Sequence, residues 1–227
     1  KDFRHLYLSD WLIALSLGAL VGVGMLFATL FSPYPFFGIV RDTNGQAFVR
    51  GVSTTIATLG GLVIMRWGGP VPFLAACGHR RKSGGSFLLG LAVGLPLAVL
   101  NVFALQFTQG QAIHWQNPLA TLLDALQPGI VEEITYRFAL WGLLWIILRN
   151  SLSDKSVYTS GLLATLVHNF AHFDALFAQA PLTALATGLA MFIIWGMPLF
   201  LLARRRGLEA AIAFHWIQDV ARFLTGF

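Results

Sequence analysis

Charged side chains are scarce in this sequence. Asp, Glu, Lys and Arg together make up 11% of its 227 residues, whereas 56% are hydrophobic and the mean hydropathy is +0.70. Soluble domains carry about 25% charged residues, so a soluble fold of this composition would lack a polar surface. Because the hydrophobic residues also occur in long runs, the composition predicts a chain that folds in a lipid bilayer.

Cysteine is nearly absent as well. Cys77 is the single cysteine, which excludes an intrachain disulfide and any multi-cysteine metal site. The net charge of +5 does not indicate a nucleic-acid partner, because the basic residues form short clusters between the apolar runs. Clusters placed in this way are typical determinants of membrane topology.

Seven apolar stretches predict an all-α fold, a polytopic membrane helical bundle that forms one integral membrane domain over residues 1–227. The first stretch exceeds the roughly 7–15 residues of a signal-peptide core. The second, short and rich in threonine, is the weakest prediction of the set. The predicted spans are Trp11–Phe31, Val52–Trp67, Ser86–Phe107, Pro128–Leu148, Val157–Ala178, Leu182–Ala203 and Leu208–Phe227.

Two connecting segments have patterns of their own. Gly68–Gly78 contains two prolines and is expected to form a loop or a re-entrant turn. Asn117–Gln127 is amphipathic, which predicts a segment that lies on a membrane surface before the fourth span. Within the spans, the pairs Gly18/Gly22 and Gly90/Gly94 permit close helix approach, although such spacing also arises by chance in glycine-rich helices.

The basic residues predict an orientation with the N-terminus in the cytoplasm. In this topology 11 of the 15 Lys and Arg residues face the cytoplasm, 3 face outward and Arg137 lies within a span. The cytoplasmic set is Lys1, Arg4, Arg66, Arg80, Arg81, Lys82, Arg149, Lys155, Arg204, Arg205 and Arg206, and the outward set is Arg41, Arg50 and Arg222.

Ionisable residues inside membrane spans are costly, so they are candidates for function by default. They gather on three of the seven spans, which we therefore expect to pack together. At 1.5 Å per residue, several of them reach a similar depth in the outer half of the bilayer. The residues are Glu132, Glu133 and Arg137 in the fourth span, His168, His172 and Asp174 in the fifth, and Glu209, His215, Asp219 and Arg222 in the seventh.

Helical spacing separates the roles of these residues. Glu133 and Arg137 are four residues apart and are expected to form a structural ion pair. Glu132 points about 100° away from Glu133 and has no obvious local cation, which suits a general base that takes a proton from water. His215 and Asp219 share a face by the same spacing. The remaining candidates, Asp174, Glu209 and Arg222, lie near helix ends and are expected to be solvated.

Three short motifs resemble those of the CPBP family, also called the ABI family, of intramembrane proteases. This family includes the type II CAAX prenyl endopeptidases and bacteriocin-processing or immunity proteins. Its E-E-x-x-x-R motif matches Glu132 to Arg137, its F-x-x-x-H motif matches His168 to His172, and its H-x-x-x-N or H-x-x-x-D motif matches His215 to Asp219. The motifs define residues 128–220 as the expected catalytic core.

The resemblance implies that Glu132 and His172 activate a water for attack on a peptide bond. His215 and Asp219 would then stabilise the oxyanion. His168 departs from the family, which has an aromatic residue there. An ionised Asp219 cannot donate a hydrogen bond, so it would have to be protonated or orient His215 instead. The expected catalytic set is Glu132, Glu133, Arg137, His172, His215 and Asp219.

A zinc site is the alternative chemistry. Glu132, His172, His215 and Asp219 are possible zinc ligands, with His168 as an extra one. The sequence contains no H-E-x-x-H motif. The metal-free glutamate mechanism is therefore favoured, and zinc stays open.

These observations predict an endopeptidase in a prokaryotic cell membrane that cleaves a membrane-associated peptide or protein. A site in the outer half of the bilayer fits a secreted or bacteriocin-type peptide better than a cytosolic prenylated protein. One rival is a non-catalytic immunity or scaffold protein of the same fold. Another is a transporter or proton channel, in which the same residues would form a relay.

Overall fold

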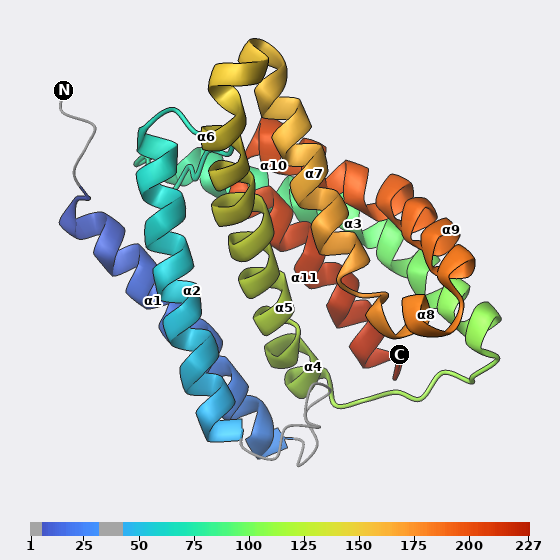
Figure 1. The fold of residues 1–227 in the computed structure, drawn as a ribbon. Helices are drawn as coiled ribbons and strands as arrows, with labels where there is room; N and C mark the ends of the chain where they lie inside the picture. The colour runs from blue at the N-terminus through green and yellow to red at the C-terminus, as the bar shows by residue number, and fades with distance from the viewer. Residues whose placement is uncertain (1–5, 32–42) are drawn as a thin grey trace.

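The computed structural model describes residues 6–31 and 43–227, and all regular structure in these residues is helical. This confirms the predicted all-α fold. The helices in Figure 1 are α1 (Leu8–Phe31), α2 (Thr43–Arg66), α3 (Arg80–Gln109), α4 (Pro118–Asp124), α5 (Leu126–Glu132), α6 (Trp141–Leu152), α7 (Ser156–Phe170), α8 (Asp174–Gln179), α9 (Pro181–Met191), α10 (Met197–Arg206) and α11 (Leu208–Leu224). Two π-helical segments, Glu133–Leu140 and Phe192–Gly196, join α5 to α6 and α9 to α10.

Four helical stretches of the described residues are long and apolar enough to cross a membrane. They are Leu8–Phe31, Asn44–Arg66, Arg80–Thr108 and Pro181–Arg206, which correspond to the first, second, third and sixth predicted spans. The other three predicted spans are helical too, but they are shorter or carry more charge. Of the residues used to orient the chain, Lys1, Arg4 and Arg41 lie outside the described residues.

One predicted span differs from the structure. The fifth span does not reach Ala178, because α7 ends at Phe170 and the chain turns before α8. His172 and Asp174 are exposed in and after this turn, and exposing such residues costs less than carrying them into hydrocarbon. The amphipathic segment Asn117–Gln127 forms α4 and the start of α5. Its helix α4 stacks on the end of α5 (Figure 1) and buries one face against α1.

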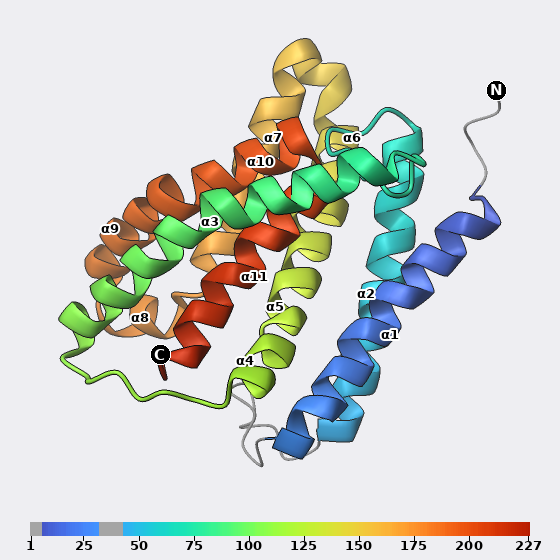
Figure 2. The same cartoon turned by 180° about the vertical axis from the view of Figure 1, so that it is seen from behind.

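The rod formed by α5, the Glu133–Leu140 segment and α6 lies at the centre of the bundle. The paired helices α1 and α2 cover one side of this rod, and α7 packs along another. Helix α11 contacts the rod and α10. Helix α3 packs across α11, in front of it in Figure 2. The charge-bearing helices α5, α7 and α11 therefore face one another inside a shell of apolar helices.

Both glycine pairs lie at close helix contacts. A Cβ atom at Gly90 would overlap the backbone carbonyl of Ala210, and one at Gly94 would crowd Phe214 of α11. Gly18 of α1 meets α2 just as closely, at the carbonyl of Gly51. The pairs thus bring α3 onto α11 and α1 onto α2, as small residues do in membrane helices.

Residues 68–79 form a loop that packs against the turn between α10 and α11. Arg204 donates to the Pro70 carbonyl at 3.0 Å, and the Leu208 N–H donates to the Pro72 carbonyl at 2.9 Å. Glu209, expected to be solvated, is only 7% exposed and accepts the Ala75 N–H at 2.7 Å. That expectation was wrong because a packed loop needs acceptors for its backbone N–H groups.

A buried ion pair ties the start of α1 to the end of α2. Arg66 Nε donates to Asp10 Oδ2 at 2.9 Å, and Asp10 is fully buried. The Tyr7 ring lies 4.5 Å from the guanidinium carbon of Arg66. The spacing of 56 residues along the chain left no local signal for this pair.

Candidate functional site

A cavity of about 410 Å³ lies between α5, α7 and α11, with further walls from α3 and the Phe192–Gly196 segment. Of the six predicted catalytic residues, five line this cavity: Glu132, Arg137, His172, His215 and Asp219. Glu133 is fully buried beside it. His168 and the polar residues Asn101, Asn169 and Gln218 also line the cavity.

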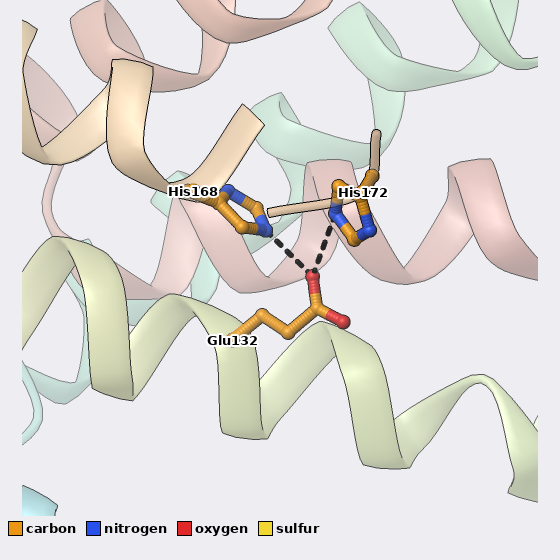
Figure 3. A group of neighbouring side chains, drawn as sticks. All are labelled: Glu132, His168 and His172. Carbon is orange, nitrogen blue, oxygen red and sulfur yellow. Dashed lines mark hydrogen bonds and ion pairs between the residues drawn. The ribbon is translucent and has the colours of Figure 1, made fainter. Parts of the chain in front are cut away.

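The Glu132 carboxylate lies at the meeting point of three imidazoles. Its Oε2 atom is 2.6 Å from His168 Nε2, 3.5 Å from His172 Nε2 and 3.8 Å from His215 Nε2. Figure 3 shows the first two contacts on the same carboxylate oxygen, while the other oxygen carries none of the drawn contacts. The Glu132 side chain is 21% exposed, so water can reach it from the cavity.

The helix widens directly after Glu132. From Glu133 to Leu140 it is a π-helix, and at its end the Trp141 N–H bonds the Tyr136 carbonyl five residues back. Such wide turns are rare and occur often at functional sites. They also change which side chains share a face, so the angles expected for a regular α-helix do not hold after Glu132.

Glu133 makes two contacts, of which only one was expected. The predicted pair with Arg137 is present but long, at 3.6 Å between Glu133 Oε2 and Arg137 Nε. The shorter contact joins Glu133 Oε1 to His215 Nδ1 at 2.8 Å. Glu133 therefore connects the first motif to the third, a role that spacing within one helix could not indicate.

His215 lies between carboxylates. With its Nδ1–H directed to Glu133, its Nε2 faces Asp219 Oδ2 at 3.4 Å and Glu132 at 3.8 Å. Asp219 Oδ1 lies 3.2 Å from Arg222, which also lines the cavity. Arg222 is thus part of the site, although it was expected to be a solvated residue near a helix end. Its guanidinium supplies the counter-charge for an ionised Asp219, which then acts as an acceptor.

The two histidines of the second motif differ strongly in exposure. The His172 side chain is 55% exposed, because it follows the end of α7 at the mouth of the cavity. His168 is 6% exposed and stacks on the Tyr136 ring at 4.5 Å between centroids. Its Nδ1 contacts Arg137 Nη1. His168 was expected only as an extra ligand, yet it makes the shortest contact to Glu132.

Among the described residues, Glu132, His168 and His172 offer ligand atoms that all lie within 4.8 Å of one another. A carboxylate with two imidazoles is a donor set that zinc accepts. Two further cavity residues have buried atoms with no hydrogen-bond partner among residues 6–31 and 43–227, namely Trp195 Nε1 and Gln218 Oε1. The sequence carried no signal for either, because both look like ordinary residues of an apolar helix.

Residues 114–221 match the model of a family described as type II CAAX prenyl endopeptidase Rce1-like. The match contains all three motifs and covers just under half of the chain. Comparison with curated proteins and with solved structures gave no match. The matched stretch contains every residue that lines the cavity except Asn101 of α3 and Arg222, which follows the end of the match by one residue.

Proposed function

We propose that this chain belongs to the CPBP family of intramembrane proteases and hydrolyses a peptide bond of a membrane-associated peptide or protein with a water that Glu132 activates. The observation that carries the proposal is the position of the Glu132 carboxylate. It lies in a cavity inside an apolar bundle, within 3.8 Å of three imidazoles from two other parts of the chain.

The reaction begins with a water held by the free oxygen of Glu132 and by His172. Glu132 takes one proton from this water, and the oxygen attacks the substrate carbonyl carbon. The new C–O bond converts the carbonyl into a tetrahedral oxyanion. Glu132 then passes its proton to the amide nitrogen, the C–N bond breaks, and an acid and an amine leave.

His215 is the proposed donor to the oxyanion. Its Nδ1–H is directed to Glu133, so its Nε2 can donate only from the imidazolium form. Glu133 and Asp219 lie on opposite nitrogens of the ring and supply negative charge beside that cation. Asp219 in this scheme orients His215 and stabilises its charge, and it makes no direct contact with the oxyanion.

The mechanism is proposed without a metal. Zinc binding by the Glu132, His168 and His172 group would require each histidine to present an unprotonated nitrogen. The contact of His168 Nδ1 with Arg137 opposes this. Metal analysis of the purified active protein tests this part, since zinc in a one-to-one ratio that is essential for activity would contradict it.

We further propose seven membrane spans with the N-terminus in the cytoplasm. The basic turns between α2 and α3, α6 and α7, and α10 and α11 all lie at the upper end of the bundle in Figure 1. His172 follows the opposite end of α7. With the basic turns in the cytoplasm, the cavity opens toward the outer side, which suits a secreted or bacteriocin-type peptide in a prokaryotic membrane.

The test compares the peptides released by membranes that contain the natural protein with those from membranes that contain the Glu132→Gln form. Glutamine keeps the size of the side chain but cannot accept the proton. We expect one or more peptides to disappear, with equal amounts of both proteins in the membrane. Identical peptide sets would overturn the proposal and favour a non-catalytic protein of this fold. Proton or solute flux in liposomes that requires Glu132, without any cleavage, would instead favour a transporter.

A further inference from the structure

We infer that His168 is a positioning residue whose tautomer is set by Arg137, so that it holds Glu132 by a donated hydrogen bond and does not act as a metal ligand. Its role in catalysis rests on the function proposed above. The tautomer itself rests on contacts between buried side chains alone.

The three side chains form one line from the protein interior to the cavity. Arg137 is 1% exposed and contacts His168 Nδ1 through Nη1. His168 Nε2 then lies 2.6 Å from Glu132 Oε2. Stacking on Tyr136 keeps the imidazole plane in place between these partners.

The chemistry of arginine decides where the imidazole proton lies. A guanidinium has five N–H donors and no acceptor, and it stays protonated in proteins. The His168 nitrogen that meets it must therefore be unprotonated and accept. A neutral imidazole carries its single proton on the other nitrogen, so Nε2–H points at Glu132. An imidazolium would place two N–H donors against each other at Arg137, which the contact excludes.

This hydrogen bond selects one orientation of the Glu132 carboxylate. The contacts from His172 and His215 to the same oxygen are longer, at 3.5 and 3.8 Å. His168 thus provides the shortest of the three contacts to Oε2. Oε1 carries none of the contacts drawn in Figure 3, which leaves it for water.

The same tautomer removes His168 from the possible metal ligands. A metal binds the unprotonated nitrogen of a histidine, and the other ring N–H normally donates to an acceptor. Ligation through Nε2 would move the proton to Nδ1, where it would face the N–H groups of Arg137. Although Glu132, His168 and His172 lie close enough to surround a metal ion, His168 in this tautomer is a hydrogen-bond donor to Glu132 and is not a ligand.

Nitrogen NMR of the protein in lipid nanodiscs measures the tautomer directly, because protonated and unprotonated ring nitrogens have well-separated signals. The protein carries ¹⁵N-labelled histidine, and loss of a signal in His168→Gln assigns the residue. We expect Nε2–H in the natural protein and a mixture of tautomers in Arg137→Gln. The exposed His114 serves as the control and should not change between the two proteins. An Nδ1–H tautomer at His168 in the natural protein would overturn the inference.

Two variants separate positioning from mere packing. In the peptide-release assay, His168→Phe removes the donor and should slow release by about 100-fold, as a displaced catalytic group does. His168→Gln keeps an N–H donor near the Nε2 position and should restore the rate to within about tenfold of the natural protein. Equal rates for the Phe and natural forms would contradict the positioning role.

Equilibrium dialysis against Zn²⁺ alone provides the last measurement. We expect the natural and His168→Phe proteins to bind Zn²⁺ equally weakly. Tight binding by the natural protein that the Phe variant loses would overturn the inference and identify His168 as a ligand. If no peptide depends on Glu132, the proposed function fails, whereas the NMR and dialysis results still decide the state of His168.

Discussion

Glu133 Oε1 lies 2.8 Å from His215 Nδ1, and this contact joins two motifs that are 82 residues apart in the chain. It leaves Glu133 shared between a histidine at the cavity and the buried Arg137. Glu133 was expected to pair with Arg137, and the structure shows that it also contacts His215 and so helps to orient that imidazole.

Substitution of Glu133 should separate its two roles. Glu133→Ala leaves the Arg137 charge buried without its nearest counter-charge and should cost about 3–5 kcal/mol of stability. Glu133→Gln keeps an acceptor for His215 but removes the negative charge, so the protein should fold while peptide release falls by about 100-fold. Thermal unfolding in detergent and the release assay measure the two effects. A fully active Gln variant would show that the charge is not needed.

The buried pair of Asp10 and Arg66 predicts a large effect far from the cavity. Asp10→Ala leaves a guanidinium at a largely buried position, which should destabilise the protein by about 3–5 kcal/mol. Asp154 provides the control, because it is exposed in the turn after α6, and Asp154→Ala should stay within about 0.5 kcal/mol. Equal unfolding temperatures for the two variants would mean that the pair contributes nothing.

Two of the four glycines of α3, Gly85 and Gly90, should respond to alanine with opposite signs. At Gly90 an added Cβ meets the backbone of Ala210, and this overlap should cost about 1–3 kcal/mol. At Gly85 no atom lies within 4 Å of the added Cβ, so alanine should stabilise the helix by about 1 kcal/mol. Unfolding measurements of both variants test the contact between α3 and α11. Stabilisation by Gly90→Ala would contradict it.

Cys77 reports the orientation of the chain. It is the single cysteine and lies exposed in the loop between α2 and α3. Although the residue is exposed at the surface, neighbouring atoms cover part of its thiol, and this partial burial raises the pKa of Cys77 above its ordinary value and outweighs the opposing effect of Arg66. Since the thiolate is the reactive form, maleimide labelling should be slow at pH 7 and accelerate as the pH rises.

With the N-terminus in the cytoplasm, a membrane-impermeant maleimide should label Cys77 in inverted vesicles and leave it unlabelled in intact cells. A Cys77→Ser form controls for labelling of other proteins. Rapid labelling in intact cells would invert the proposed orientation and place the mouth of the cavity on the cytoplasmic side.

Part of the site could be predicted from the sequence, because ionisable residues are energetically costly in apolar helices and are therefore rare there. Glu132, His172 and His215 were predicted to converge, and the structure brings their side chains to one cavity. The importance of His168 was underestimated, since its partners Arg137 and Glu132 lie on a different helix. Arg222 was assigned to solvent because its position near a helix end does not reveal its contact with Asp219.

The sequence by itself determined that the chain suits a lipid bilayer, that its fold is helical, and which three spans carry ionisable groups. These properties depend on the length and composition of apolar segments, which can be read directly from the sequence. Only the tertiary structure decided where α7 ends, which carboxylate contacts which histidine, and which nitrogen of His168 faces Arg137. A titratable side chain takes its role from partners supplied by other helices, and packing alone brings those partners within hydrogen-bond distance.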